Sequence, residues 1–461
     1  MAEDRAEDET REEQDYRLDR ALVDLVLDAV EAGDAARLTE LLEPLHAADI
    51  ADLLEQVGGA DRRAFLRLWG REIDGEILSE IDESIREEVI GALPREVLAE
   101  AVRDLDSDDV VDLIEDLEEP QQEAILDALD EADRAAVEQS LTYPEYSAGR
   151  LMQREVVTAP EHWTVGEAID FLRAEEWLPD QFYHVILVDP RMHPVGYVTL
   201  GKLLSSRRDV ALRAITEDSF RTISVYQEEA DVAYAFNQYH LISAPVVDDD
   251  DRLVGVITID DAMSVLDEEH EEDILRLAGV GEESSLSDTV LETARQRLPW
   301  LFVNLLSANL AAAVIALFEG TIERLVALAV LMPIVASMGG NAGTQTLTVA
   351  VRALATKNLT ESNVWRVVRR EAVVGLVNGL TFATVMGLVA MLWFGEPLLG
   401  LVIAAALVVN LLIAALAGIL VPLALERLGA DPALASGTFV TTVTDVVGFF
   451  AFLGLAAAVL L

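Results

Sequence analysis

One acidic residue lies inside an apolar segment near the C-terminus. Asp445 belongs to the run TFVTTVTDVVGFFAFLGL, from Thr438 to Leu455, in which the other residues are apolar or carry only hydroxyl groups. A charge at the centre of a membrane-spanning helix costs about 2.5–3.5 kcal/mol on insertion scales, and aspartate is too short to reach the interface. Intramembrane acids usually face a pathway, so we predict that role for Asp445.

A polar segment also interrupts an earlier apolar run. The sequence PIVASMGGNAGTQT, which begins at Pro333, combines glycines with Asn341, Thr344 and Gln345. Polar or irregular backbone at membrane depth is tolerated where protein or water satisfies it, whereas small residues alone permit a close helix crossing. Because amides accompany the glycines, the pattern favours a cavity lining over a close crossing alone.

These apolar segments offer only hard oxygen ligands. The chain has no cysteine, and all 6 histidines precede the first apolar span, so a zinc protease or a thiolate-based pump would lack its ligands. Carboxylate, amide, hydroxyl and carbonyl oxygens suit Mg²⁺, Mn²⁺ or Ca²⁺. One carboxylate per chain is too few to strip Mg²⁺ of its water, but two Asp445 side chains across a dimer axis could hold a hydrated ion.

The composition predicts an acidic soluble part followed by a membrane part. The net charge is −50 although 52% of the residues are hydrophobic, because most of the acids precede about residue 285 and the apolar runs fill the rest. This charge argues against nucleic acid and favours cations as partners. Lysine occurs only as Lys202 and Lys357, a composition that suits a cytoplasm at molar salt, where the Debye length is about 3 Å; we therefore expect a halophilic source. No G-x-x-x-x-G-K-[ST] loop occurs, so we expect neither an ATP-driven pump nor an enzyme.

Five apolar segments are long enough to span a membrane, and they form an all-α membrane domain over residues 298–461. They begin near Leu298, Ile322, Ala372, Leu398 and Ala433. The connection between the second and third segments is rich in arginine, and the neighbouring connections carry mainly glutamate. The positive-inside rule places the basic connection and the acidic N-terminal part in the cytoplasm and Leu461 outside the cell membrane.

The N-terminal part is predicted to be helical. Residues 1–18 read as a disordered acidic tail. Over residues 19–143, short helical patterns such as LHAADIADLLEQV (from Leu45) and LDSDDVVDLIEDL (from Leu105) recur with the same apolar spacing. This predicts an α-solenoid of stacked hairpins, with an unrepeated helical domain as the alternative.

Two α/β units follow, over residues 144–208 and 209–270. HVILVDPRMHPVGYVTLGKLL and APVVDDDDRLVGVITIDDAMSVL each read as strand, turn, strand and helix, and the arrangement resembles a tandem pair of CBS domains. In that family G-x-x-[ST]-x-x-D holds a nucleotide's ribose, which implies ATP or another adenine nucleotide at Thr258 and Asp261 of the second copy. The first copy has Lys202 in place of the acid. The alternative that both CBS copies are structural dimerisation modules is equally open.

The whole arrangement resembles the MgtE family of magnesium channels. The motifs that carry the resemblance are YPEYSAGRLM from Tyr143, PIVASMGGNAGTQ from Pro333 and DPALASGTFVTTVTDVVGF from Asp431, joined by a connecting (plug) helix over residues 271–297. The resemblance implies a homodimer in the lipid bilayer with one pore on its axis, and with Asp445 and Asn341 at the ion site.

The resemblance also implies closure by Mg²⁺ bound between acidic cytosolic faces, because bare carboxylates repel and a divalent cation bridges them. The matching positions are Asp108, Asp112, Asp261, Glu269, Glu272, Asp273 and Asp431. Ser264, His240 and Ala230 stand where acids are expected, which implies fewer or weaker regulatory ions. The competing hypotheses are a channel for Mn²⁺ or Co²⁺ and a membrane sensor of nucleotide or ionic strength that conducts nothing.

Overall fold

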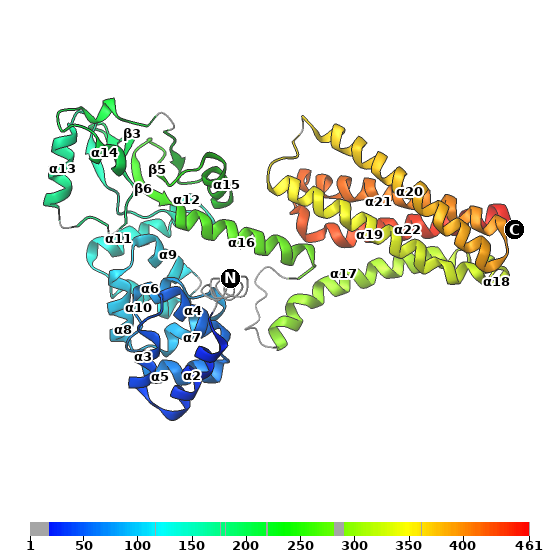
Figure 1. Cartoon of the computed structure of the whole chain (residues 1–461), viewed down its shortest axis with the longest axis horizontal. Coiled ribbons are helices and arrows are strands. Elements are labelled where there is room, and N and C mark those ends of the chain that lie inside the picture. The colour runs from blue at the N-terminus through cyan, green and yellow to red at the C-terminus, as the bar shows by residue number, and fades with distance from the viewer. Residues whose placement is uncertain are drawn as a thin grey trace, which may run out of the picture. The chain divides into compact units, whose positions relative to one another are not determined.

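The computed structural model describes residues 18–460 except 116, 176, 180, 218, 219, 281–289 and 361. The predicted acidic tail, apart from Leu18, therefore lies outside the described residues. The chain divides into two compact units, Met1–Glu268 and Glu269–Leu461 (Figure 1).

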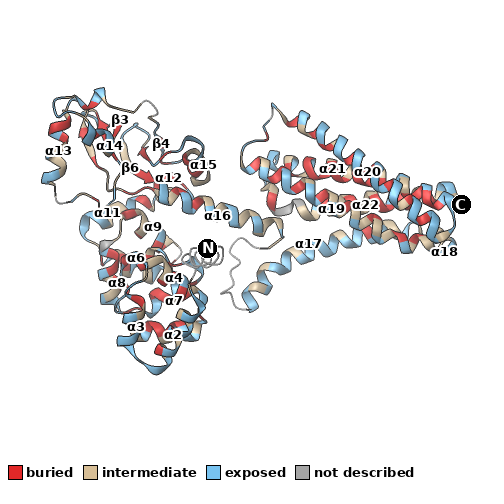
Figure 2. Cartoon of the chain, in the orientation of Figure 1, coloured by how far each residue is buried: buried red, intermediate tan, exposed pale blue. Residues whose placement is uncertain are grey.

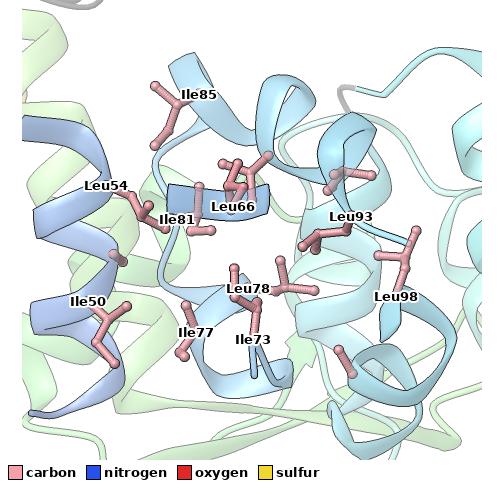
Figure 3. Close-up of a cluster of buried hydrophobic side chains, with 14 of the residues drawn as sticks. Ile50, Leu54, Leu66, Ile73, Ile77, Leu78, Ile81, Ile85, Leu93 and Leu98 are labelled. Atoms are coloured by element: carbon pink, nitrogen blue, oxygen red, sulfur yellow. The ribbon is translucent and has the colours of Figure 1, made fainter. Parts of the chain in front are cut away.

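The first unit begins with stacked short helices. They are α2 (Arg20–Ala32), α3 (Ala35–Leu42), α4 (Ala47–Gln56), α5 (Gly59–Trp69), α6 (Gly75–Ser79), α7 (Glu83–Ala92), α8 (Arg95–Ala101), the 3-10 turn η1 (Val102–Asp104), α9 (Ser107–Glu115), α10 (Glu119–Leu126) and α11 (Glu131–Ser140). Their apolar faces form one continuous core from α2 to α11, part of which is shown in Figure 3. Several aspartates cap helix N-termini, among them Asp34, Asp74 and Asp130, so part of the acidity has a structural role.

Buried arginines join successive helical hairpins. Arg62 of α5 donates to the carbonyl oxygens of Leu54 (2.8 Å) and Val57 (3.1 Å) and forms an ion pair with Glu88 of α7. Arg86 of α7 repeats the arrangement, because it forms an ion pair with Asp112 of α9 at 2.8 Å. Each guanidinium thus bonds backbone carbonyls and forms an ion pair with a carboxylate of the next hairpin, a contact typical of stacked repeats.

Two similar α/β subdomains complete the first unit. Their elements are α12 (Ala148–Leu151), β1 (Thr158–Pro160), α13 (Val165–Ala174), β2 (His184–Val188), β3 (Pro194–Thr199), α14 (Leu200–Ser205) and η2 (Leu212–Ala214), then β4 (Ile223–Ser224), α15 (Glu229–Tyr239), β5 (Ser243–Val247), β6 (Leu253–Thr258) and α16 (Ile259–Leu277). The sheets have the orders β1-β2-β3 and β4-β5-β6, each with one parallel and one antiparallel pair.

The two sheets share their register as well as their topology. His184 pairs with Thr199 in the first sheet, as Ser243 pairs with Thr258 in the second, and each antiparallel pair shifts register near its end. His184 Nδ1 lies 2.5 Å from Ser243 Oγ, so equivalent positions of the two copies meet. The predicted tandem pair is confirmed.

The second unit contains the apolar helices. They are α17 (Val290–Ala316), the short α18 (Glu319–Arg324), α19 (Ala327–Ala355), α20 (Val364–Phe394), α21 (Pro397–Arg427) and α22 (Pro432–Leu460). Five of them are long and apolar enough to cross a membrane, which confirms the predicted spans. The second span begins later than predicted, because Ile322 belongs to the short helix α18 and the spanning helix α19 begins only at Ala327. The predicted connecting segment includes the end of α16, the start of α17 and residues outside the described part.

Helix α21 lies at the centre of the membrane unit. It is largely buried among α19, α20 and α22, whereas α17 and α20 are mostly exposed (Figure 2). Glycines let α20 approach α21 closely, because a Cβ at Gly375 would lie 2.9 Å from the carbonyl oxygen of Leu411. The unit is therefore assembled around α21, and α19 and α22 are the helices that carry Asn341 and Asp445.

The buried arginines lead to a stability prediction. Arg62→Met should lower the unfolding free energy of the helical repeats by about 3 kcal/mol, because two buried carbonyls and Glu88 lose their donor. Hydrogen exchange of residues 47–92 in urea measures this. Arg63 also pairs with Glu88 but is 55% exposed, so Arg63→Met should change stability by less than about 1 kcal/mol. Equal effects of the two substitutions would contradict the account.

Candidate functional site

Helices α19 and α22 run antiparallel and bring Asn341 and Asp445 to similar depth. Gly339 of α19 and Gly448 of α22 both lie against the side chain of Asn410 in α21. Further along α19, a Cβ atom placed on Gly343 would lie 2.6 Å from Val440 of α22. At 1.5 Å rise per residue, Asn341 is about 3 Å beyond Gly339 and Asp445 about 4.5 Å from Gly448 in the same direction. The same count from the Gly343–Val440 contact leaves the two residues about 4.5 Å apart, so the two predicted ion-site residues lie within about one helical turn of the same level along the helices.

Helix α19 exposes polar side chains within its apolar span. Asn341, Thr344, Gln345 and Thr348 are all exposed. Within the described part of the chain, the Asn341 amide donates only to the Ser337 hydroxyl, 3.4 Å away on the same helix. Asp445 is partly buried. Polar groups at membrane depth require water or a protein partner, so the exposed residues of α19 must line a water-filled path or meet another copy of the chain.

The threonines before Asp445 bond to their own helix. The hydroxyl groups of Thr441, Thr442 and Thr444 donate to the carbonyls of Gly437 (2.9 Å), Thr438 (2.7 Å) and Thr441 (3.0 Å). Thr444 is fully buried and packs toward Gly343, while Thr442 also bonds Ser307 of α17. Of these three hydroxyls only that of Thr442 also joins α22 to another helix, and none of them is bonded to Asp445 among the described contacts.

The first unit brings together Asp108 and Asp261. Asp108 is in the first turn of α9 and Asp261 is in the first turn of α16. Asp106, Asp109 and Asp260 lie near them. Burial, and then repulsion by neighbouring carboxylates, raises the pKa of Asp108 well above its usual range and that of Asp109 to about 7. Burial likewise raises the pKa of Asp261 to about 7. Protons or a divalent cation would relieve this repulsion.

Asp112 contributes to the repulsion that acts on Asp109, but its own carboxylate is already paired with an arginine. Its carboxylate accepts from Arg86 at 2.8 Å and joins two helical hairpins. Among the described residues, no group of three His, Asp or Glu side chains is placed to hold a metal ion directly. A regulatory ion at the Asp108–Asp261 surface would therefore keep part of its water or require the carboxylates to move.

The acids predicted at the connecting helix meet around an arginine. Arg276 of α16 forms ion pairs with Glu272 (2.8 Å) and with Asp431 (2.9 Å), which also caps α22 through the N–H of Ala433. Burial, and then neighbouring acids, raise the pKa of Glu269 and of Asp273. The guanidinium supplies a built-in positive charge between the end of α16 and the start of α22, a contact that the acid pattern alone did not predict.

The predicted nucleotide residues contact each other. Asp261 Oδ2 accepts from the backbone N–H (3.3 Å) and the hydroxyl (2.8 Å) of Thr258, an arrangement that caps α16. In the first copy, Thr199 caps α14 through the N–H of Lys202, which pairs with Glu217. The second copy thus presents a carboxylate and the first an ammonium at the equivalent position.

Two functional candidates were not predicted from sequence. Ser307 is unremarkable in sequence, and only its bond to Thr442 marks it. Asn410 is fully buried in α21 and donates to the carbonyl of Val335 at 2.8 Å. It is an isolated amide in the run LVIAAALVVNLLIAAL, so the reasoning applied to Asp445 could have found it.

These features define a multi-pass membrane protein with a soluble helical domain and a CBS pair before its spans. Family models match a divalent cation transporter over residues 332–455, the MgtE intracellular N domain over 45–146 and CBS domains over 148–209 and 214–268. The chain belongs to the MgtE family of magnesium transporters.

Named relatives agree with this assignment. The magnesium transporter MgtE of Enterococcus faecalis is 34% identical over 321 residues, which cover 70% of this chain and 71% of the relative. That of Thermus thermophilus is 34% identical over 330 residues, 71% of this chain and 73% of the relative. A solved structure, the cytosolic domain of the Mg²⁺ channel MgtE in complex with ATP, is 29% identical and covers 53% of this chain and 99% of its own, with a TM-score of 0.49.

The raised pKa values predict a pH-dependent acidic surface. Asp109 and Asp261 bind their protons more tightly in the folded chain (pKa about 7) than in the unfolded chain (about 4), so this contact is most stable at low pH and loses stability as pH rises towards 7. In metal-free protein, hydrogen-exchange protection of residues 105–112 should fall between pH 5 and pH 8. Asp109→Asn should reduce the dependence, and equal protection at both pH values would refute the raised pKa values.

Proposed function

We propose that this chain forms a homodimeric Mg²⁺ channel with one pore on the two-fold axis. The observation that carries the proposal is the exposed polar side of α19, which has Asn341 at the depth of Asp445. A second copy related by a two-fold axis would cover these groups and enclose water between them. The five spans and the basic connection support a cytoplasmic soluble part and an external C-terminus.

The ion passes with water still bound. Each chain contributes one carboxylate and nearby amide oxygens, so two chains provide two carboxylates at one level. Mg²⁺ releases its water reluctantly and is held through few direct ligands, so outer-shell hydrogen bonds to Asp445 and Asn341 suit it. The ion moves down its electrochemical gradient. Mn²⁺ and Co²⁺ share this chemistry and are the alternative cargo.

Cytosolic Mg²⁺ closes the pore by replacing protons and water between carboxylates. Asp108 and Asp261 face each other in the first unit, and Glu269, Glu272, Asp273 and Asp431 gather in the second. A divalent cation offsets the repulsion that, together with the larger effect of burial, raises these pKa values, and its loss would weaken both contacts.

A nucleotide in the second CBS domain is a further part of the proposal. The solved relative was crystallised with ATP, and Thr258 and Asp261 stand at the matching motif. Asp261 lies near Asp108 and Asp260, which would repel bare phosphates. The residues therefore fit a nucleotide that arrives as its Mg²⁺ complex, with Asp261 positioned for a ribose hydroxyl.

The pore assignment is tested by Asp445→Asn. In liposomes containing a Mg²⁺-sensitive dye, this change should lower Mg²⁺ influx at least tenfold, because the site loses both charges, while the dimer remains intact on size-exclusion chromatography. Glu319→Gln, which removes an exposed acid on α18, is the matched control and should retain influx. If the Asp445→Asn variant admits Mg²⁺ at the wild-type rate, the pore assignment is rejected. If the wild-type protein admits no Mg²⁺, the non-conducting sensor is favoured instead.

The gating assignment is tested with the same liposomes. Raising Mg²⁺ on the side that bears the soluble domains should stop conduction, and Asp108→Asn with Asp261→Asn should shift the closing concentration upward at least threefold because the ion loses two ligands. Single-channel open probability measures this. A closing concentration that is unchanged in the double variant would exclude this surface as a regulatory site.

A further inference from the structure

Asn410 places a fully buried amide at the centre of the membrane unit. Its Nδ2 donates to the carbonyl of Val335 in α19 at 2.8 Å, and its Oδ1 has no hydrogen-bond partner within the described part of the chain. An apolar residue would fill this position in α21 without the cost of burying an amide. A polar group kept at such a position points to a function beyond packing.

Glycines on two other helices make room for this amide. A Cβ at Gly339 of α19 would lie 2.3 Å from Asn410 Nδ2, and a Cβ at Gly448 of α22 would lie 2.8 Å from it. The same hypothetical atoms would lie 3.0 and 2.9 Å from Oδ1, so the whole amide group packs against both glycines. Asn410 is therefore wedged between α19 and α22.

The wedge lies beside the predicted ion site. Gly339 is two residues from Asn341, and Gly448 is three residues from Asp445. We propose that Asn410 is a positioning residue of the ion pathway, which sets the separation and register of α19 and α22 and thereby the placement of Asn341 and Asp445. The expected effect of Asn410 on transport rests on the proposed function, whereas its expected effect on the arrangement of α19 and α22 does not.

The experiment compares Asn410→Leu with Asn378→Leu. Asn378 is an exposed amide on α20, so its replacement controls for the loss of an amide from a span. In liposomes, Asn410→Leu should lower maximal Mg²⁺ influx at least tenfold and change the Mg²⁺-to-Mn²⁺ influx ratio at least threefold, while Asn378→Leu changes neither. Wild-type influx and ratio in Asn410→Leu would overturn the proposal, as would a loss of influx with an unchanged ratio.

A geometric measurement accompanies the flux assay. The chain has no cysteine, so nitroxide labels at Val326→Cys and Val459→Cys report the separation of the outer ends of α19 and α22 after dilution with unlabelled chain. Asn410→Leu should shift or broaden this distance distribution, and an unchanged distribution would overturn the proposal even if no transport were seen. Absent transport by the wild type together with a shifted distribution would reject the proposed function alone.

A paired substitution covers the case in which Asn410→Leu does not fold. Gly339→Ala places a methyl group at the amide, so it should impair influx in the presence of Asn410. Asn410→Ala removes the side chain that the new methyl group would meet. In the Asn410→Ala background, Gly339→Ala should therefore lower Mg²⁺ influx by less than a further twofold. Independent, multiplying effects of the two substitutions would contradict direct contact between the two positions.

Discussion

A carboxylate at membrane depth must face water or a compensating group, and the membrane unit is organised around that requirement. Asp445 is held on α22 beside threonines whose hydroxyl groups are already bonded to their own helix. Helix α19 exposes Asn341 at the same depth, and α21 holds the two helices together. The exposed polar side chains of α19 are thus groups that water or a protein partner must satisfy.

Positive charge of two kinds offsets the carboxylates elsewhere in the described part of the chain. Arginine serves this purpose within the helical repeats and at Asp431, where Arg86 and Arg276 form ion pairs. Protons serve it at Asp109 and Asp261, whose pKa values rise to about 7. A divalent cation can replace protons at such a surface but cannot displace a buried arginine as readily, so the Asp108–Asp261 contact is the better candidate for control by Mg²⁺ than Asp112.

The order of domains could be predicted because each has its own sequence period. Recurrent helical patterns, the paired strand–turn–strand units and five apolar runs all appear in the structure. What sequence could not predict was pairing across distance: Arg86 with Asp112, Arg276 with Asp431 and Ser307 with Thr442 are contacts set by tertiary packing. Asn410 differs, because an isolated amide in an apolar run is a visible signal, and only its neighbours Gly339 and Gly448 required the structure.

If two Asp445 side chains share one ion, as we propose, dimers in which only one chain is altered distinguish that arrangement from two separate pathways. Chains with two different affinity tags allow purification of dimers in which one subunit carries Asp445→Asn. A shared site predicts Mg²⁺ influx far below half that of the wild-type dimer, because one lost charge disables the common site. Influx at half the wild-type rate would mean that each chain conducts by itself and would contradict the account.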